Sequence, residues 1–171
     1  MNQLLMEIAE RISGEVPELE RMIKRAQTAW DKASMVSTEQ DFYLDSVALN
    51  LHGIYSGIEK LFELIAVHLD DNPPKGKTWH RDLLRKMTQE VPGKRPAVIA
   101  CDRLPRLDAL RRFRHLVRNV YTFNLALEKV APIIAGLSEL WVPLKDELLA
   151  FAEYTDDMGG DGGDGGDGGR P

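Results

Sequence analysis

The residues best suited to chemistry gather between Arg111 and Tyr121, where the sequence reads RRFRHLVRNVY. This stretch brings several arginines together with a histidine, an asparagine amide and a tyrosine phenol. Guanidinium groups bind phosphate oxygens in a bidentate manner and stay charged at any working pH. The stretch is therefore a candidate site for binding a phosphodiester.

Placed on an ideal helix, at about 100° per residue, the stretch has an apolar flank and a polar flank. The apolar flank consists of Leu110, Phe113, Val117 and Val120. Beside it fall Arg114, Arg118 and Tyr121, and the polar side continues through Arg111, His115 and Thr122. A charged run on an amphipathic helix usually does no more than face solvent, which is the competing interpretation. Six arginines and no lysine between positions 103 and 118 weaken that interpretation, because this usage is atypical of plain solubility.

The spacing Arg114-x4-Asn119-x-Tyr121 resembles the Arg-x4-His-x-Tyr signature of HEPN-domain ribonucleases, specifically the HepT-like toxins. Three segments in the same order extend the resemblance: ALNLHGIYSGIE at 48–59, GKTWHRDLL at 76–84 and RFRH at 112–115. The resemblance as a whole runs from about position 41 to position 154, which is most of the chain.

The resemblance implies an all-α fold, a HEPN-like antiparallel bundle of about five helices that acts as a homodimer. Paired signature helices would form a cleft that cuts RNA without a metal ion or cofactor. Arg114 would bind and polarise the scissile phosphate, while Arg111, His115 and Arg118 would contact RNA. The implied partner is an MNT-type nucleotidyltransferase antitoxin, which silences such toxins by adding AMP to the signature tyrosine, here Tyr121.

One departure from the signature bears on catalysis, because Asn119 occupies the position of the family histidine. An amide cannot exchange a proton near neutral pH, and general acid–base help is typically worth about 10²–10⁴-fold in rate. Asn119 could still orient a ribose hydroxyl or a phosphate oxygen. His115 could supply the proton chemistry, or it could be an ordinary hydrogen-bonding residue on the helix surface. The alternative function is a catalytically inactive HEPN dimer that serves as an RNA- or partner-binding scaffold.

Geometry adds a condition to either function. Arg114 and Asn119 lie about 140° apart on a straight helix, so one helix alone does not bring them together. A complete site would need the second subunit or a local distortion of the helix.

The bulk numbers fit one domain with a flexible end. We expect a HepT-like helical domain over residues 1–154 and a flexible, acidic Gly/Asp-rich tail over residues 155–171. The tail holds five aspartates and one arginine, a net charge of −4, so the domain carries −1 of the total of −5. A near-neutral domain with a local basic strip is compatible with RNA contact.

A cytoplasmic protein is expected from several features that the sequence lacks. Cys101 is the single cysteine, so no intrachain disulfide can form, and we read it as a small residue near a helix start. The sequence has no signal-peptide pattern and no apolar run approaching a membrane span. It also has no Cys/His cluster for zinc and no P-loop motif, so neither a metal nor a nucleotide cofactor is expected.

Helical periodicity and loop signals predict the order of the elements. The expected helices span residues 2–12, about 17–33, 39–69, 78–91, 102–124 and 128–154, with loops at 70–77 and 92–96. Whether Ser13-Gly14 separates the first two helices or only kinks a single one stays open. Pro143 is expected to kink or split the last helix.

The long helix expected over 39–69 carries a continuous apolar stripe and should form the centre of the core. Gly53 and Gly57 lie one turn apart inside it, and each costs about 1 kcal/mol relative to alanine. Close approach of another helix or of a twin subunit would explain them. Room for a bulky neighbour such as Trp79 is the other explanation.

Three polar side chains outside the signature stretch have simpler expected roles. His80, beside Trp79, is expected to cap a helix or to form a hydrogen bond, and catalysis is its less favoured role. Lys94 and Arg95, in the loop at 92–96, would widen the basic surface.

Overall fold

The computed structural model describes residues 2–35, 38–70, 73–119 and 127–160. Its helices are α1 (Asn2–Met35), α2 (Gln40–Leu69), α3 (Trp79–Met87), the short 3-10 helix η1 (Cys101–Arg103), α4 (Leu104–Asn119) and α5 (Leu127–Gly160). No strand is present in these described ranges, apart from one isolated bridge between Val91 and Arg95. The all-α bundle predicted from the sequence is confirmed.

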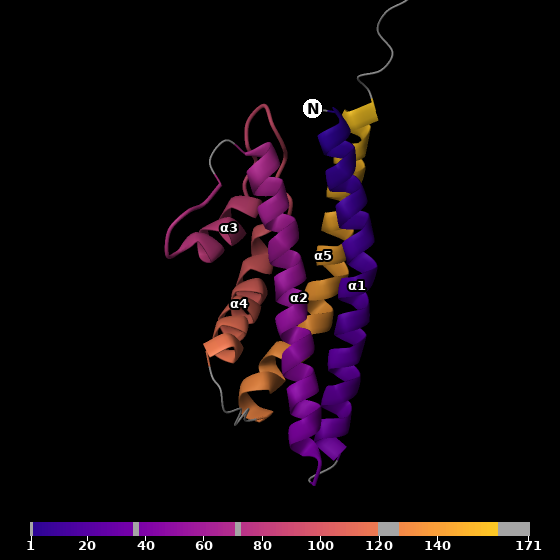
Figure 1. The fold of residues 1–171 in the computed structure, drawn as a ribbon, viewed down its shortest axis with the longest axis vertical. Helices are drawn as coiled ribbons and strands as arrows, with labels where there is room; N and C mark the ends of the chain where they lie inside the picture. The colour runs from indigo at the N-terminus through magenta and orange to yellow at the C-terminus, as the bar shows by residue number, and fades with distance from the viewer. Residues whose placement is uncertain (1, 36–37, 71–72, 120–126, 161–171) are drawn as a thin grey trace, which may run out of the picture.

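Three long helices, α1, α2 and α5, pack side by side along the molecule (Figure 1). The shorter helices α3 and α4 lie against α2 on the side away from α1 (Figure 1). α1 runs antiparallel to both α2 and α5, so α2 and α5 run in the same direction, and α4 runs antiparallel to α2. The apolar stripe of α2 meets both groups, because nearly all its members from Leu44 to Ile65 are buried. As a result α2 is the central element, and α4 is held against its polar edge.

α1 continues without interruption through Ser13, Gly14 and Pro17, so the two expected N-terminal pieces form one helix. A proline inside a helix costs about 3 kcal/mol or more. Large side chains on both sides of it are fully buried, including Ile12 and Leu19. Each such burial contributes about 1.5–3 kcal/mol, so packing along α1 outweighs the lost hydrogen bond.

The glycines of α2 are explained by α1. A Cβ atom on Gly53 would lie 2.7 Å from the sulfur of Met22, and one on Gly57 would lie 2.8 Å from a methyl carbon of Leu19. The nearest atoms thus belong to a neighbouring helix and not to Trp79, so close approach of another helix is the correct explanation.

α5 runs through both of its prolines and is not split at Pro143. The buried residues Trp141 and Leu144 flank Pro143 and anchor the helix to the core on either side. α5 also extends six residues beyond the expected end at position 154. Thr155 is fully buried there and donates a hydrogen bond to the carbonyl of Ala152. The expected division into a domain and a flexible tail stays a prediction, since residues 161–171 lie outside the described ranges.

The loop between α3 and η1 corrects one expectation about charge. Arg95 does not widen the basic surface, because its side chain is fully buried. Its guanidinium donates to both carboxylate oxygens of Asp70, at 2.7 and 2.9 Å, and also to the carbonyl of Gln89 at 3.0 Å. The positive φ of Gly93 allows the tight turn that carries Arg95 inward. This ion pair ties the loop to the end of α2. α3 accordingly ends at Met87, earlier than expected.

Candidate functional site

Arg114 projects from α4 onto the polar edge of α2. Its Nε donates to the hydroxyl of Ser56 at 3.0 Å, and its Nη1 donates to Oε1 of Glu59 at 2.9 Å. The guanidinium carbon also lies 5.9 Å from the centre of the Tyr55 ring. The side chain of Arg114 is 19% exposed and that of Glu59 is 7% exposed. A guanidinium has five N–H groups, and these two hydrogen bonds use two of them.

The same Glu59 carboxylate also holds a histidine. Its second oxygen, Oε2, lies 2.5 Å from Nδ1 of His80, at the start of α3. The ring of Trp79 stacks on the imidazole with a centroid distance of 3.7 Å. A proton placed on Nδ1 would be donated to the carboxylate, which leaves Nε2 as a hydrogen-bond acceptor. One buried carboxylate therefore joins Arg114 to His80, from three helices that lie far apart in sequence.

Tyr55 forms the floor beside this network and is fully buried. Burial, and then the neighbouring charge of Glu59, raise the pKa of the Tyr55 phenol above its usual value. The phenol therefore stays neutral through the physiological range. It adds no competing charge between Glu59 and the guanidinium.

The other arginines of α4 whose side chains the structure describes pair with carboxylates. Arg111 and Arg112 both bind Asp108, at 2.7 and 2.6 Å, and Arg106 pairs with Glu139 of α5. Partial burial acts to raise the pKa of Asp108, but hydrogen bonds from the two arginines outweigh it and hold that pKa below its usual value. Much of the cationic strip seen in the sequence is therefore locally neutralised. Arg114 differs from these arginines in its partner, because it pairs with a carboxylate of α2.

The predicted site residues fall into two groups. Arg114 and His115 are described on α4, the first against α2 and the second on the exposed side of the helix. Arg118 and Asn119 belong to the last turn of α4, but their side chains lie outside the described part of the structure, as does Tyr121 altogether. The roles predicted for all six site residues, Arg111 included, stay predictions.

Sequence reasoning missed two partners of Arg114 and underrated a third residue. Ser56 and Glu59 had no predicted role beyond their place in the family-like segment 48–59, and His80 was expected only to cap a helix or to form a hydrogen bond. A signal was available for Glu59, because a carboxylate within the apolar stripe of a buried helix needs a partner. Nothing in the sequence says which cation that partner is.

Two absences concern the described residues only. Among residues 2–35, 38–70, 73–119 and 127–160, no group of three or more His, Cys, Asp or Glu side chains could hold a metal ion. None of the helices in those ranges is both long enough and apolar enough to cross a membrane.

Comparison with known proteins gives one match. A family model described as "HepT-like protein" matches residues 46–155, which include most of α2, all of α3 and α4, and most of α5. No curated protein and no solved structure matches the chain significantly. The matched range contains the whole network of Arg114, Glu59 and His80.

Proposed function

This chain belongs to the HepT-like protein family, and we propose that it is a metal-independent endoribonuclease of the HEPN type. The observation that carries the proposal is the Glu59 carboxylate, which binds Arg114 through one oxygen and His80 through the other. This arrangement puts a phosphate-binding cation and a proton-exchanging ring on one rigid support.

Arg114 is the phosphate-binding residue in this proposal. Ser56 and Glu59 fix its side chain before substrate arrives, so little conformational freedom is lost on binding. The N–H groups that these two residues do not use can bind two oxygens of one phosphate. Donors fixed in advance stabilise the charge that develops on the phosphate in the transition state.

His80 supplies the proton chemistry that Asn119 cannot. Its Nε2 takes the proton of the ribose 2′-hydroxyl, whose oxygen attacks phosphorus while the bond from phosphorus to the 5′-oxygen breaks. The departing 5′-oxygen takes a proton from water, and His80 returns its proton to solvent. The products are a 2′,3′-cyclic phosphate and a 5′-hydroxyl. Glu59 stabilises the imidazolium, as the carboxylate does in a catalytic triad.

Asn119, Arg111, His115 and Arg118 have supporting roles in the proposal. Asn119 orients the substrate, and the other three contact RNA. A homodimer would complete the site, because Arg114 and Asn119 point about 140° apart on one helix. Leu116 of α4 is 42% exposed and offers apolar surface to a second copy.

The family assignment also supports a proposal about regulation. We propose that an MNT-type nucleotidyltransferase antitoxin silences the protein by adding AMP to Tyr121. The matched family and the position of Tyr121 just beyond α4 support this proposal. Mass spectrometry of the protein after co-expression with a neighbouring nucleotidyltransferase gene should reveal a Tyr121 adduct of AMP mass.

A catalytically inactive scaffold is the second candidate function. It is favoured by Asn119 in the signature and by the carboxylates that pair with the described α4 arginines, because this pairing leaves less charge for substrate. Such a protein would bind RNA or a partner through the same surface without cutting.

Cleavage of labelled transfer RNA and messenger RNA in EDTA tests the two candidates. The wild type, Arg114→Ala and Asn119→His are compared, with Arg112→Ala as a matched control because that arginine is 71% exposed on the same helix. Arg114→Lys keeps a cation beside Glu59 if the alanine variant unfolds. The nuclease requires cleavage by the wild type and by Arg112→Ala, with loss in both Arg114 variants. An inert wild type together with an active Asn119→His would establish the scaffold instead.

A further inference from the structure

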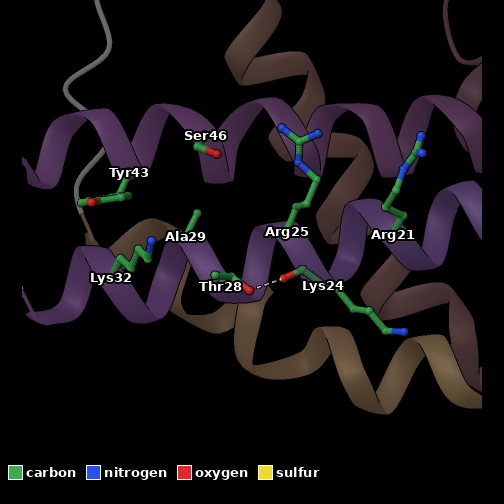
Figure 2. A pocket seen from close by; sticks show the side chains of 8 residues that line it. All are labelled: Arg21, Lys24, Arg25, Thr28, Ala29, Lys32, Tyr43 and Ser46. Atoms are coloured by element: carbon green, nitrogen blue, oxygen red, sulfur yellow. Dashed lines mark hydrogen bonds between the residues drawn. The ribbon is translucent and has the colours of Figure 1, made fainter.

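A second concave feature lies between α1 and α2, far along α2 from the Glu59 network. It is a groove of about 370 Å³, and four cations of α1 line it: Arg21, Lys24, Arg25 and Lys32. Figure 2 shows Arg21 and Arg25 pointing from α1 toward α2, while Lys32 lies beside Tyr43. No carboxylate lines this groove among the described residues.

The groove exists because its floor is made of small side chains. Ala29 of α1 and Ser46 of α2 lie where the two helices face each other. Small residues there leave a furrow, and the long cationic side chains form its edges. Tyr43 closes one end, with the ammonium of Lys32 5.8 Å from the centre of its ring.

Charge is segregated along α1 in a way that solubility does not require. Positions 2–20 carry five glutamates and one arginine, a net charge of −4, whereas positions 21–35 carry four cations and one aspartate, a net charge of +3. All four of those cations line the groove. A patch of one sign concentrates counter-ions of the opposite sign on its surface.

The cations differ in how far they are already neutralised. Arg21 pairs with Glu18, and the charge of Lys24 acts on Glu20. Arg25 forms no ion pair or hydrogen bond with any other residue that the structure describes. A guanidinium that is exposed, free of carboxylates and aimed across a groove is well placed to bind a phosphate.

We propose that this groove binds the sugar–phosphate backbone of single-stranded RNA, outside the cleavage site. The RNA ligand rests on the proposed function, whereas the groove and its charge do not. From Arg21 to Lys32 the helix rises about 16 Å, which suits a chain of phosphates better than a single nucleotide. A cationic groove with an aromatic ring is the usual way in which proteins bind single strands without reading sequence.

The groove and the Glu59 network can share one strand. Ser46 lines the groove and Ser56 binds Arg114, and about 15 Å of α2 separates these two positions. A strand of several nucleotides crossing the exposed side of α2 would reach both. The groove therefore holds the RNA on one side of the bond that is cut.

Binding of fluorescent 2′-O-methyl RNA oligonucleotides to the full chain tests the proposal, because a blocked 2′-hydroxyl prevents cleavage. Affinities are measured from 50 to 300 mM salt for the wild type, Arg25→Gln and Arg25→Gln with Lys32→Gln. The matched control is Arg11→Gln, an exposed arginine on the same helix that sits among Glu7, Glu10 and Glu15. Thermal unfolding of each variant confirms that it is folded.

Each lost phosphate contact should lower the salt slope by about 0.7 and weaken binding about fivefold at 0.1 M salt. The double variant should therefore bind about 25-fold more weakly, while Arg11→Gln should match the wild type. Unchanged affinity in the double variant would overturn the proposal, and so would equal binding of a mononucleotide or equal competition by poly-glutamate. The outcomes separate the two ideas. Cleavage with no effect of the groove variants refutes only the groove, and groove-dependent binding with no cleavage refutes only the nuclease.

Discussion

Replacing Glu59 with glutamine is the most informative single change, because it keeps the shape of the side chain and alters only its charge and hydrogen bonding. The carboxylate accepts from Arg114 with one oxygen and contacts Nδ1 of His80 with the other. A glutamine amide has one oxygen and one NH₂ group. The oxygen must face Arg114, since a guanidinium can only donate, so the NH₂ group must face His80.

That orientation of the amide changes which ring nitrogen of His80 carries the proton. Nδ1 of His80 would have to accept the amide hydrogen, so the ring proton would move to Nε2. Nε2 then can no longer take the proton of a 2′-hydroxyl. Loss of a general base costs about 10²–10⁴-fold in rate, and an incorrect tautomer in a serine-protease triad costs about 10⁴-fold. We therefore expect Glu59→Gln to cleave RNA at least 100-fold more slowly.

Binding and stability should change much less than the rate. Removing one partner of a buried ion pair costs about 3–5 kcal/mol, but Arg114 is 19% exposed and keeps one hydrogen bond to the amide oxygen. A loss of about 1–3 kcal/mol is therefore expected, or a fall in Tm of about 3–10 °C for a chain of this size. Affinity for uncleavable RNA should stay equal or increase, because Arg114 is no longer neutralised.

The assay combines single-turnover cleavage, 2′-O-methyl RNA binding and thermal unfolding. Glu63→Gln, an exposed position one turn further along α2, is the control. Cleavage by Glu59→Gln at the wild-type rate would refute the role of the carboxylate and of His80. A parallel loss of binding and rate would show that Glu59 only positions Arg114.

Three further predictions concern stability. Gly57→Ala should lower the free energy of unfolding by about 1 kcal/mol, since a methyl group forced against α1 costs about 1–3 kcal/mol and the higher helix propensity of alanine returns about 1 kcal/mol. Gly14→Ala, where the added methyl meets open space, should raise the free energy of unfolding by up to about 1 kcal/mol in the same urea titration. Arg95→Met should cost up to about 3–5 kcal/mol in that titration, because it removes the main partner of the buried Asp70 and leaves only the ammonium of Lys86, 3.4 Å away, to pair with it. A smaller loss in the double variant Arg95→Met with Asp70→Asn would show that the two residues are coupled. Tyr55→Phe should reduce the fall in the free energy of unfolding at alkaline pH. In the wild type the raised pKa of the phenol favours folding below about pH 10, and this contribution is lost as the pH rises further. The prediction would be contradicted if the free energy of unfolding fell equally between about pH 8 and pH 11 in the wild type and in Tyr55→Phe.

Most of the fold followed from local patterns. The apolar stripe of α2 and the proline-rich loop after it are set by periodicity and backbone chemistry, which act within a few residues. The expectations that failed involve competition between local and distant forces. Of the two outcomes expected at Pro143, a kink or a split, the split does not occur, because the burial of Trp141 and Leu144 holds α5 together.

Charge was harder to predict than burial, for a physical reason. An arginine on a helix face can meet solvent, a carboxylate on its own helix or a carboxylate on another helix, and the sequence does not distinguish these outcomes. Arg112 is largely exposed and pairs with Asp108 of its own helix, whereas Arg114 pairs with Glu59 of α2. Arg95, in a loop, is fully buried against Asp70. The Coulomb energy of an ion pair can differ by several kcal/mol between such environments, because the effective dielectric constant depends on how deeply the pair is buried.

The signature position of α4 lacks a proton-exchanging side chain, because Asn119 stands there. Considered on α4 alone, this substitution weakens the nuclease hypothesis. In the folded chain, however, His80 contacts the same Glu59 carboxylate that binds Arg114, although His80 lies about 40 residues before Asn119 in the sequence. A proton acceptor need not come from the helix that binds the phosphate, since catalysis depends on distance in space. The decisive comparison is therefore His80→Ala against Asn119→His: if the first silences cleavage and the second adds little, the acid–base group has moved to another helix.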